Sequence, residues 1–453
     1  MLPKFSEIIC NFVRMNRKEI IQSIISIMQQ ELPFEVIERD IQLPIDSNQI
    51  ITVSGVRRCG KSSVMKLVAN QLIRKGVRPE NILWINFDDE RLDGMKAEDL
   101  DTVLTAYREM FPDIPLDSVY MFFDEIQYVD KWELFIIRLY KTYCKNIYIT
   151  GSNSQMLSGH ISTALRGWPL EFVEFPLSFH EYLTFKNIKT DFYSERGRAI
   201  LYSAFKDYLF GSSFPEIVLM NEKSMQIQKI QGYFNTMLMR DLSEYHQFSH
   251  TSVFRYFLKR IMGDLTKPTS VNKIYNDIKS QGNKVDKNRL YEIAESACDI
   301  FLLFRVNKWT KSLIEENNKL PKYYLIDNGM RNAIIMPQSN DMGKLLENAV
   351  FLQLKRRCSP FAKIFYYSQG VECDFVVQEE TEITHLIQVC WDISSEETLH
   401  RELRGLKAAS QATGCRNCCI ITMDESREFL YEDLSIKVYQ AWKWFLRDFA
   451  VTM

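Results

Sequence analysis

QIITVSGVRRCGKSSVMKLVANQL, residues 49–72, decides the fold of the N-terminal half of the chain. An apolar run leads into the loop GVRRCGKS, and an amphipathic pattern follows it. The loop fits G-x-x-x-x-G-K-[ST], in which two glycines let backbone N–H groups converge on phosphate oxygens at a helix N-terminus. The alternative is a chance turn, which the strand and helix patterns on either side disfavour. The expected nucleotide-binding residues are Gly55, Val56, Arg57, Arg58, Cys59, Gly60, Lys61, Ser62 and Ser63.

Two side chains of this loop are expected to carry the chemistry. Lys61 would reach the β- and γ-phosphates of a nucleotide, and the Ser62 hydroxyl would coordinate Mg²⁺. Cys59 stands beside Arg58 near the helix N-terminus, and such surroundings lower the pKa of a thiol. We therefore expect alkylation of Cys59 to block nucleotide binding. The alternative is that cysteine simply fits a position whose side chain is not used.

Length and composition limit the class of protein. A chain of 453 residues exceeds what one hydrophobic core usually organises, so about two to four domains are expected. The net charge of −2 gives no global basic field of the kind that binds nucleic acid. No apolar stretch resembles a signal peptide or a membrane helix, so we expect a cytoplasmic protein without membrane contact. Cys415, Cys418 and Cys419 lie at the start of an apolar run without a nearby histidine, which favours core cysteines over a zinc site.

Strand-like apolar runs alternate with helical patterns between residues 49 and 152. This alternation predicts a parallel sheet covered by helices on both faces, which is an α/β fold. The expected strands are 51–55, 81–89, 119–125 and 146–152, and helices are expected after residue 61, near 98–110 and over 132–144. A helix is also expected before the sheet, because Ile20, Ile21, Ile24, Ile25 and Met28 fall on one face.

The strand VYMFFDE ends in two carboxylates, Asp124 and Glu125. In an open parallel sheet, ligands bind beyond the carboxyl ends of the strands, so this pair should share a crevice with the phosphate loop. We expect Asp124 to hold Mg²⁺ through water and Glu125 to be the general base that activates the attacking water. A strand that ends in Asp-Glu is by itself more often structural. One further strand lies between the phosphate loop and this carboxylate pair along the chain, and this spacing favours a catalytic role for the pair.

The strand NIYITGS leads into further polar residues. Asn153 is the expected nucleotide sensor and Ser152 the second candidate, whereas the alternative is a serine that caps the next helix. Arg166 lies downstream of this strand. It could reach the γ-phosphate bound by a neighbouring subunit as an arginine finger, or it could be an ordinary solvated arginine.

The motifs GVRRCGKSS, FFDEIQ, TGSNSQML, LRGW and FPLSFHEYL occur in this order. In this respect the chain resembles a large prokaryotic family of P-loop ATPases with an AAA-type core and a C-terminal domain of unknown function related to restriction endonucleases. The likeness continues through YLFGSSFPEIVL and YFNTMLMRDLSE. In that family an arginine commonly follows the glycine of the LRGW element, where this chain has Trp168. The resemblance implies ATP as the nucleotide, Mg²⁺ as cofactor, and self-association.

The predicted organisation has an N-terminal helical segment (1–45), an AAA-type ATPase core (46–180), a helical lid (181–248), a winged helix-turn-helix (249–335) and a restriction-endonuclease-like domain (336–453).

The winged helix leaves two kinds of partner open. On DNA, the start of its third helix would face the major groove with Lys284, Lys287, Asn288 and Arg289. Two glutamates follow on the same helix, and winged helices also serve as spacers that bind proteins. The partner predicted for this element is therefore DNA or protein.

The last domain departs from the nuclease pattern. That pattern needs an acidic residue on one strand and (Asp/Glu)-x-Lys on the next, so that carboxylates hold a divalent cation and lysine positions the water. Glu347, Glu372 and Asp374 are available carboxylates. However, the next strand has Gln388 and Cys390 where the acid and the lysine should stand. We therefore expect a degenerate, inactive nuclease fold.

Together these features predict a Mg²⁺-dependent ATPase that couples ATP hydrolysis to movement of a winged-helix and nuclease-like module acting on DNA. The first alternative is a nucleotide-gated binding switch with little turnover. The second alternative is a nuclease.

Overall fold

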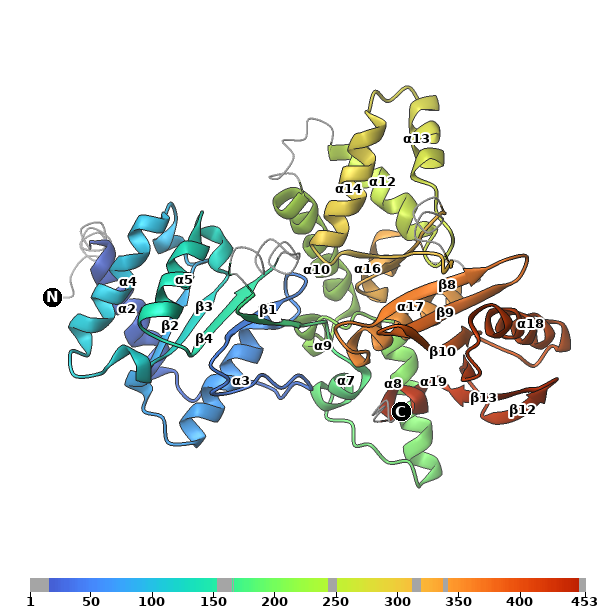
Figure 1. Ribbon diagram of the computed structural model, residues 1–453, viewed down its shortest axis with the longest axis horizontal. Helices are drawn as coiled ribbons and strands as arrows, with labels where there is room; N and C mark the ends of the chain where they lie inside the picture. The colour runs from blue at the N-terminus through green and yellow to red at the C-terminus, as the bar shows by residue number, and fades with distance from the viewer. Residues whose placement is uncertain are drawn as a thin grey trace. The chain divides into compact units, whose positions relative to one another are not determined.

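The computed structural model of the protein describes residues 16–152, 165, 167–242, 251–311, 319–336 and 341–447 (Figure 1). It divides the chain into two units, Met1–Glu174 and Phe175–Met453. The first unit is built on a five-stranded sheet and the second contains a six-stranded sheet and a separate pair of strands.

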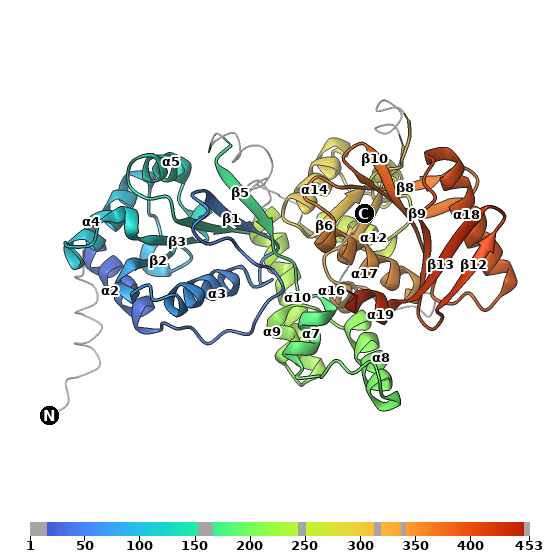
Figure 2. The same cartoon turned by 60° about the horizontal axis from the view of Figure 1, so that its bottom comes forward.

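The sheet of the first unit is entirely parallel (Figure 2). Its strands are β1 (Ile50–Ser54), β2 (Ile82–Asn86), β3 (Tyr120–Asp124), β4 (Ile147–Gly151) and β5 (Pro169–Val173). Their order is β2-β3-β4-β1-β5. The predicted α/β sheet is therefore confirmed, with β5 as a further strand that the sequence pattern did not reveal. Because β4 lies between β1 and β3, the phosphate loop after β1 and the carboxylates after β3 flank the end of β4.

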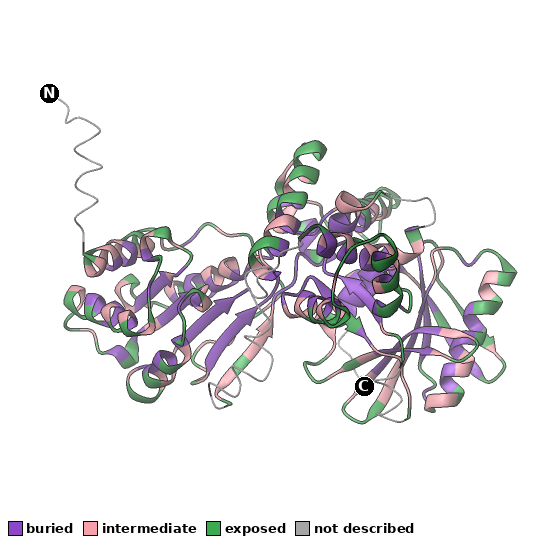
Figure 3. Cartoon of the chain, turned by 90° about the horizontal axis from the view of Figure 1, so that it is seen from above, coloured by how far each residue is buried: buried purple, intermediate pink, exposed green. Residues whose placement is uncertain are grey.

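Helices cover this sheet through two apolar clusters. The first contains α3 (Lys61–Arg74), and the second contains α2 (Arg17–Gln30), α4 (Asp101–Met110) and α5 (Trp132–Thr142). Neighbouring residues of one strand join different clusters, because successive side chains of a strand point to opposite faces. Every residue of β1 and β4 is buried, which explains why these strands are continuously apolar (Figure 3).

The helices begin where local capping allows it. Asn16 and Glu19 form a capping box, so α2 starts at Arg17 with its first N–H groups satisfied. Ile21, Ile24 and Ile25 of this helix are buried, as the apolar spacing predicted. The short 3₁₀ turns of this unit are Pro79–Asn81, Glu90–Leu92, Ala97–Leu100, Leu116–Ser118 and Ile126–Tyr128.

The second unit starts with helices α7 (Phe179–Phe185), α8 (Glu195–Phe210), α9 (Pro215–Leu219) and α10 (Lys223–Thr236), and a π-helical turn, Met237–Leu242. Ser178 and Glu181 form a capping box that begins α7, and Pro215 occupies the first turn of α9. Most of these helices cover residues 181–248, the segment predicted as a lid. Helix α8 contacts α16 (Asn328–Ile334) and α17 (Met342–Arg357), which also belong to the second unit.

Three helices and a strand pair follow. They are α12 (Thr251–Gly263), α13 (Val271–Ser280), α14 (Lys287–Asp299) and the antiparallel strands β6 (Leu303–Val306) and β7 (Lys322–Leu325). The three helices and β6 lie in the segment where a winged helix-turn-helix was predicted. Strand β7, KYYL, was not predicted.

The remaining sheet is mixed. Its strands are β8 (Lys363–Ser368), β9 (Glu372–Glu379), β10 (Glu382–Val389), β11 (Cys418–Thr422), β12 (Arg427–Tyr431) and β13 (Leu434–Gln440), and the helices beside it are α18 (Glu396–Thr413) and α19 (Ala441–Leu446). The order is β12-β13-β11-β10-β9-β8, with parallel pairs on both sides of β11. A bulge shifts the register of β8 and β9 beside Asp374, and bulges of this kind re-aim side chains.

A membrane span needs a helix of sufficient length and hydropathy. None of the helices that the structure describes meets both requirements.

A ladder of stacked rings supports the first sheet. Phe122 of β3 lies 5.0 Å from Trp84 of β2 and 4.8 Å from Tyr148 of β4, measured between ring centroids. The rings are nearly parallel, at 13° and 12°. Phe122 is fully buried and in register with both neighbours. It therefore connects three adjacent strands.

We expect Phe122→Ala to destabilise the first unit by about 3–5 kcal/mol, because it removes apolar area and leaves a cavity between two rings. The measurement is urea unfolding followed by circular dichroism. Leu134→Ala is the matched control, since Leu134 is 68% exposed on α5, and it should change the free energy of unfolding by no more than about 0.5 kcal/mol. Equal effects of the two substitutions would contradict the structural role of the ladder.

Candidate nucleotide-binding site

The phosphate loop has an unusual backbone. Gly55, Arg58 and Gly60 all have positive φ angles, of 153°, 71° and 112°. A Cβ atom on Gly55 would lie 2.1 Å from the carbonyl oxygen of Glu174, so only glycine fits there. The two glycines of the motif are therefore required, one by close approach of another backbone and both by their φ angles.

The loop ends at the N-terminus of α3. Gly60 is the N-cap residue and makes no side-chain capping bond, so the first N–H groups of the helix have no side-chain partner at the cap. Lys61 is the first residue of the helix and is buried. Its ammonium donates to the carbonyl oxygens of Gly55 at 3.2 Å and Val56 at 3.4 Å, which folds the side chain back over the loop.

A buried ion pair lies behind the loop. The side chains of Arg39 and Glu174 are paired and almost completely buried. Arg39 also donates to the carbonyl oxygen of Cys59 at 2.9 Å, and the backbone N–H of Glu174 donates to the carbonyl oxygen of Ser54 at 2.7 Å. Together these contacts fix both ends of the loop. This support was not predicted, because Arg39 lies outside any motif and Glu174 follows a strand that was not predicted.

The carboxylate pair lies at the end of β3, as predicted. Asp124 is buried and accepts hydrogen bonds from the hydroxyls of Thr150 and Ser62. Burial raises the pKa of Asp124, with a further contribution from the charge of Glu125. Thr150 also accepts from the N–H of Glu125 at 2.9 Å. Thr150, at the end of the central strand β4, was missed in the sequence because threonine is common in strands.

Glu125 has the left-handed conformation, with φ of 52°, and its carboxylate lies 3.4 Å from the ammonium of Lys61. Burial raises the pKa of Glu125, but the charge of Lys61 and a hydrogen bond from Gln127 outweigh it, so the net shift is downward. For Lys61, burial lowers the pKa and the charge of Glu125 raises it above its ordinary value. Both groups are therefore ionised at neutral pH.

The predicted sensor and finger lie at the edge of what the structure describes. Asn153 and Arg166 are outside the described residues. Ser152, the second sensor candidate, is buried, and its hydroxyl lies 3.4 Å from the side-chain nitrogen of Gln127. Arg57, in the loop, donates to the hydroxyl of Tyr128 at 3.2 Å.

The expected lowering of the pKa of Cys59 is wrong. The thiol is completely buried, and burial raises its pKa to about 11. The charge of Lys61 acts in the opposite direction but is the smaller effect. Proximity to a helix N-terminus and to basic residues does not lower the pKa of a thiol that has lost its hydration.

The residues that meet here suit a nucleotide with its metal ion. A buried ammonium and a helix N-terminus favour phosphate oxygens. The hydroxyl of Ser62 and the carboxylate of Asp124 are hard oxygen donors of the kind Mg²⁺ prefers. Glu125 stands beside both groups as an ionised base.

A second charged cluster lies in the second unit. The ammonium of Lys322, on β7, is fully buried and lies 3.1 Å from Glu347, 2.7 Å from Glu372 and 3.4 Å from Asp374. Tyr324 donates to Glu347 at 2.8 Å. The pKa of Lys322 is raised well above its ordinary value, because the carboxylates, Glu347 foremost, outweigh the effect of burial.

This cluster brings the three predicted carboxylates together and adds a lysine that the sequence pattern did not reveal. Gln388, which replaces the expected acid, accepts from the N–H of Asp374 at 3.2 Å and donates to Glu402. Lys322 therefore places a positive charge among these carboxylates, from a different strand than the one that leads to Cys390. Within the described residues, no group of three or more His, Cys, Asp or Glu side chains is arranged to hold a metal ion. Cys415, Cys418 and Cys419 are buried free thiols, as predicted.

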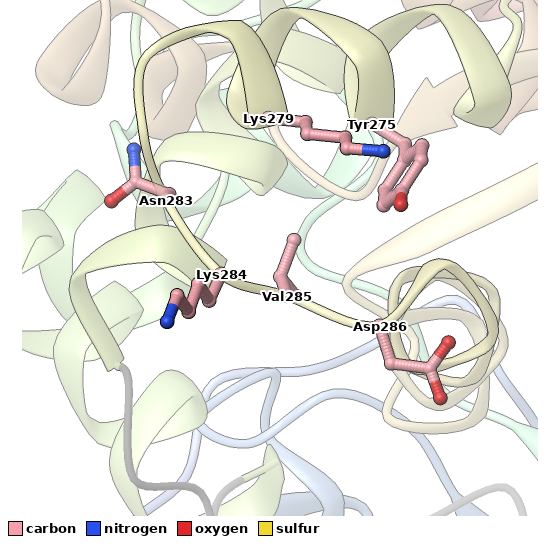
Figure 4. A pocket seen from close by; sticks show the side chains of 6 residues that line it. All are labelled: Tyr275, Lys279, Asn283, Lys284, Val285 and Asp286. Atoms are coloured by element: carbon pink, nitrogen blue, oxygen red, sulfur yellow. The ribbon is translucent and has the colours of Figure 1, made fainter.

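A pocket of about 520 Å³ lies at the turn between α13 and α14 (Figure 4). Its lining residues are Tyr275, Lys279, Asn283, Lys284, Val285 and Asp286. Asp286 caps α14 by accepting from the N–H of Asn288 at 3.0 Å. The predicted contact residues Lys284, Lys287 and Asn288 are exposed. Arg289, the fourth, lies 3.6 Å from Glu292 on the same helix.

Comparison with known proteins identifies relatives over most of the chain. Residues 47–183 match a family model described as an AAA domain, and residues 202–341 match one described as a domain of unknown function. The uncharacterized protein MJ1544 of Methanocaldococcus jannaschii is 31% identical over 421 residues, which cover 91% of each chain. An uncharacterized protein of Haemophilus influenzae is 28% identical over 357 residues, or 77% of this chain and 84% of the relative.

Solved structures give weaker likenesses. The Orc1 protein of Aeropyrum pernix in complex with DNA is 13% identical and has a TM-score of 0.28, with 70% of this chain and 92% of that chain covered. Cdc6p of Pyrobaculum aerophilum is 11% identical with a TM-score of 0.24, covering 70% and 93%. TM-scores this low do not establish a shared overall fold.

We expect Cys59 to resist alkylation by iodoacetamide at neutral pH in the folded protein. The reason is that a pKa of about 11 leaves only a very small fraction of thiolate, and the thiolate is the reactive form. Peptide mass spectrometry measures the labelling. The same chain in concentrated urea is the control and should be labelled at Cys59. Rapid labelling of the folded protein, suppressed by ATP, would restore the original expectation.

We expect Lys322→Met to destabilise the second unit by about 3–5 kcal/mol, because the substitution leaves buried carboxylates without their counter-charge. The measurement is urea unfolding at neutral pH. Lys229→Met is the matched control, since the ion pair of Lys229 with Glu216 is largely exposed, and it should have little effect. A variant at Lys322 that is as stable as this control would contradict the role of the ammonium.

Proposed function

The chain belongs to the same family as protein MJ1544 of Methanocaldococcus jannaschii, and we propose that it is a Mg²⁺-dependent ATPase with an AAA-type core. One observation carries the proposal. Lys61, Asp124 and Glu125 converge at one edge of a parallel sheet, with Lys61 3.4 Å from Glu125. This is the set of charges that phosphate binding, metal binding and activation of water require.

Each residue has a part in the proposed reaction. Lys61 and the N–H groups at the start of α3 would bind the phosphates of ATP, and Ser62 and Asp124 would hold Mg²⁺. The bound Mg²⁺ would neutralise charge on the transferred phosphoryl group. Glu125 would take a proton from the attacking water, for which its ionised form is suited. Asn153 as sensor and Arg166 as finger of a neighbouring subunit complete the proposal.

The loop offers a route by which the nucleotide could influence the rest of the chain. Glu174 is the last residue of the first unit. Its carbonyl oxygen packs against Gly55 and its side chain pairs with Arg39 behind the loop. A change in the loop on ATP binding or hydrolysis would therefore act on the segment that connects to the second unit. We propose that this coupling moves the C-terminal unit.

We propose that the second unit contains a lid, a winged helix and an inactive nuclease-like domain, with DNA or a protein as its partner. The lysines around the turn between α13 and α14 suit a nucleic acid backbone, whereas the glutamates later on α14 suit a protein. Nuclease activity is not part of the proposal, because Gln388 and Cys390 stand where the nuclease pattern needs an acid and a lysine. The three carboxylates are instead paired with the ammonium of Lys322. The reaction is assigned to the cytoplasm, where the free cysteines of the described residues would stay reduced.

We expect purified protein to release phosphate from ATP in the presence of Mg²⁺. Lys61→Ala should lose both ATP affinity and turnover, because it removes the buried cation. Glu125→Gln should keep ATP affinity and lose roughly 10²- to 10⁴-fold in turnover, because the amide cannot take a proton. Phosphate release and binding of a fluorescent ATP analogue measure the two quantities.

Lys75→Ala and Glu98→Gln are matched controls at exposed positions and should behave as wild type. Unchanged turnover in both site variants would refute the ATPase. ATP binding without turnover, equal in wild type and Glu125→Gln, would instead identify a nucleotide-gated switch. Stimulation of turnover by added DNA would assign DNA as the partner.

A further inference from the structure

Gln127 lies between the expected base and the end of the neighbouring strand. It belongs to the 3₁₀ turn Ile126–Tyr128, directly after Glu125. Its side-chain nitrogen donates to the carboxylate of Glu125 and lies 3.4 Å from the hydroxyl of Ser152. One amide group therefore links the end of β3 to the end of β4.

The orientation of this amide is fixed by chemistry. A carboxylate accepts hydrogen bonds but cannot donate them, so the nitrogen of Gln127 must face Glu125. The oxygen of the amide then points the other way. This oxygen is buried and has no hydrogen-bond donor among the described residues. A buried acceptor without a donor is rare in folded proteins, and this one lies beside the site of the proposed reaction.

The backbone supports the same arrangement. Glu125 has a φ of 52°, an unfavourable conformation for glutamate, and its N–H is held by Thr150. The carboxylate is then fixed on one side by Lys61 and on the other by Gln127. Strain of this kind persists where the surroundings hold a group in place.

We propose that Gln127 is a positioning residue for ATP hydrolysis: its nitrogen holds the carboxylate of Glu125, and its oxygen accepts a hydrogen bond from the attacking water. The inference rests on the proposed ATPase function. In the reaction, the water oxygen forms a bond to the γ-phosphorus while the bond from that phosphorus to the bridging oxygen breaks. The proton of the water passes to Glu125, and ADP and phosphate are released.

Two substitutions test the amide. Gln127→Met has a similar volume but neither donor nor acceptor. Gln127→Glu keeps an acceptor but places a second carboxylate beside Glu125 and removes the donor. We expect both to lower kcat, Gln127→Met by roughly a hundredfold, because a misplaced base and water lose the reactive geometry. The affinity for ATP should stay within about twofold of wild type, since phosphate binding depends on Lys61 and the loop.

Gln71→Met is the matched control, because Gln71 is exposed on α3, and its kcat should equal that of wild type. Gln127→Met is also combined with Glu125→Gln and measured in single turnover. A residue that acts through Glu125 adds no further loss once Glu125 is replaced, whereas an independent effect would multiply.

The outcomes are distinct. A wild-type protein without turnover overturns the ATPase and this inference together. Turnover by wild type that survives in Gln127→Met overturns the inference alone. A loss of ATP affinity or of thermal stability in parallel with kcat also overturns it, because either would indicate a merely structural role. The same holds if the losses in kcat multiply in the double variant. Loss of kcat alone, absent in the Glu125→Gln background, supports it.

Discussion

The order of the parallel strands is the constraint on which the first unit depends. Because β4 lies between β1 and β3, the phosphate loop and the carboxylates meet across the end of a third strand, whose Thr150 touches both Asp124 and the backbone of Glu125. The carboxyl ends of parallel strands all lie at one edge, so charges far apart in sequence are concentrated there. Because these groups are buried, the pKa of each one depends on the charges beside it. The ion pair of Lys61 with Glu125 is the clearest result.

The backbone of the site is under equally tight control. Gly55 and Gly60 meet conformational demands that other residues meet poorly, and Glu125 adopts an unfavourable φ angle while Thr150, Gln127 and Lys61 contact it. Behind the loop, the side chains of Arg39 and Glu174 form a buried ion pair. Contacts of this kind hold the backbone of the loop in one conformation, and preorganised groups of this sort make binding sites effective.

The second unit handles its buried charge differently. Three carboxylates collected by α17 and β9 would repel one another, and the ammonium of Lys322 from β7 lies within ion-pair distance of all of them. The predicted carboxylates do come together, but the lysine comes from a different strand from the one that the motif specifies. A motif with fixed spacing does not reveal this lysine, because residues that are far apart along the chain can lie side by side in the fold. Strand β7 was itself not predicted.

The sequence by itself determined the α/β sheet, the phosphate loop and the carboxylate pair, because strand alternation, paired glycines and strand-end acids are local patterns with local physical causes. For the second unit it predicted a helical lid, a winged helix and a nuclease-like domain. Only the tertiary structure decided the environment of each group. The pKa of Cys59 is raised because burial outweighs its basic neighbours, and the amide of Gln127 lies between Glu125 and Ser152. The support from Arg39 and Glu174 and the ammonium of Lys322 likewise depend on contacts between distant segments. Desolvation and hydrogen bonding depend on what surrounds an atom, and that is known only once the chain has folded.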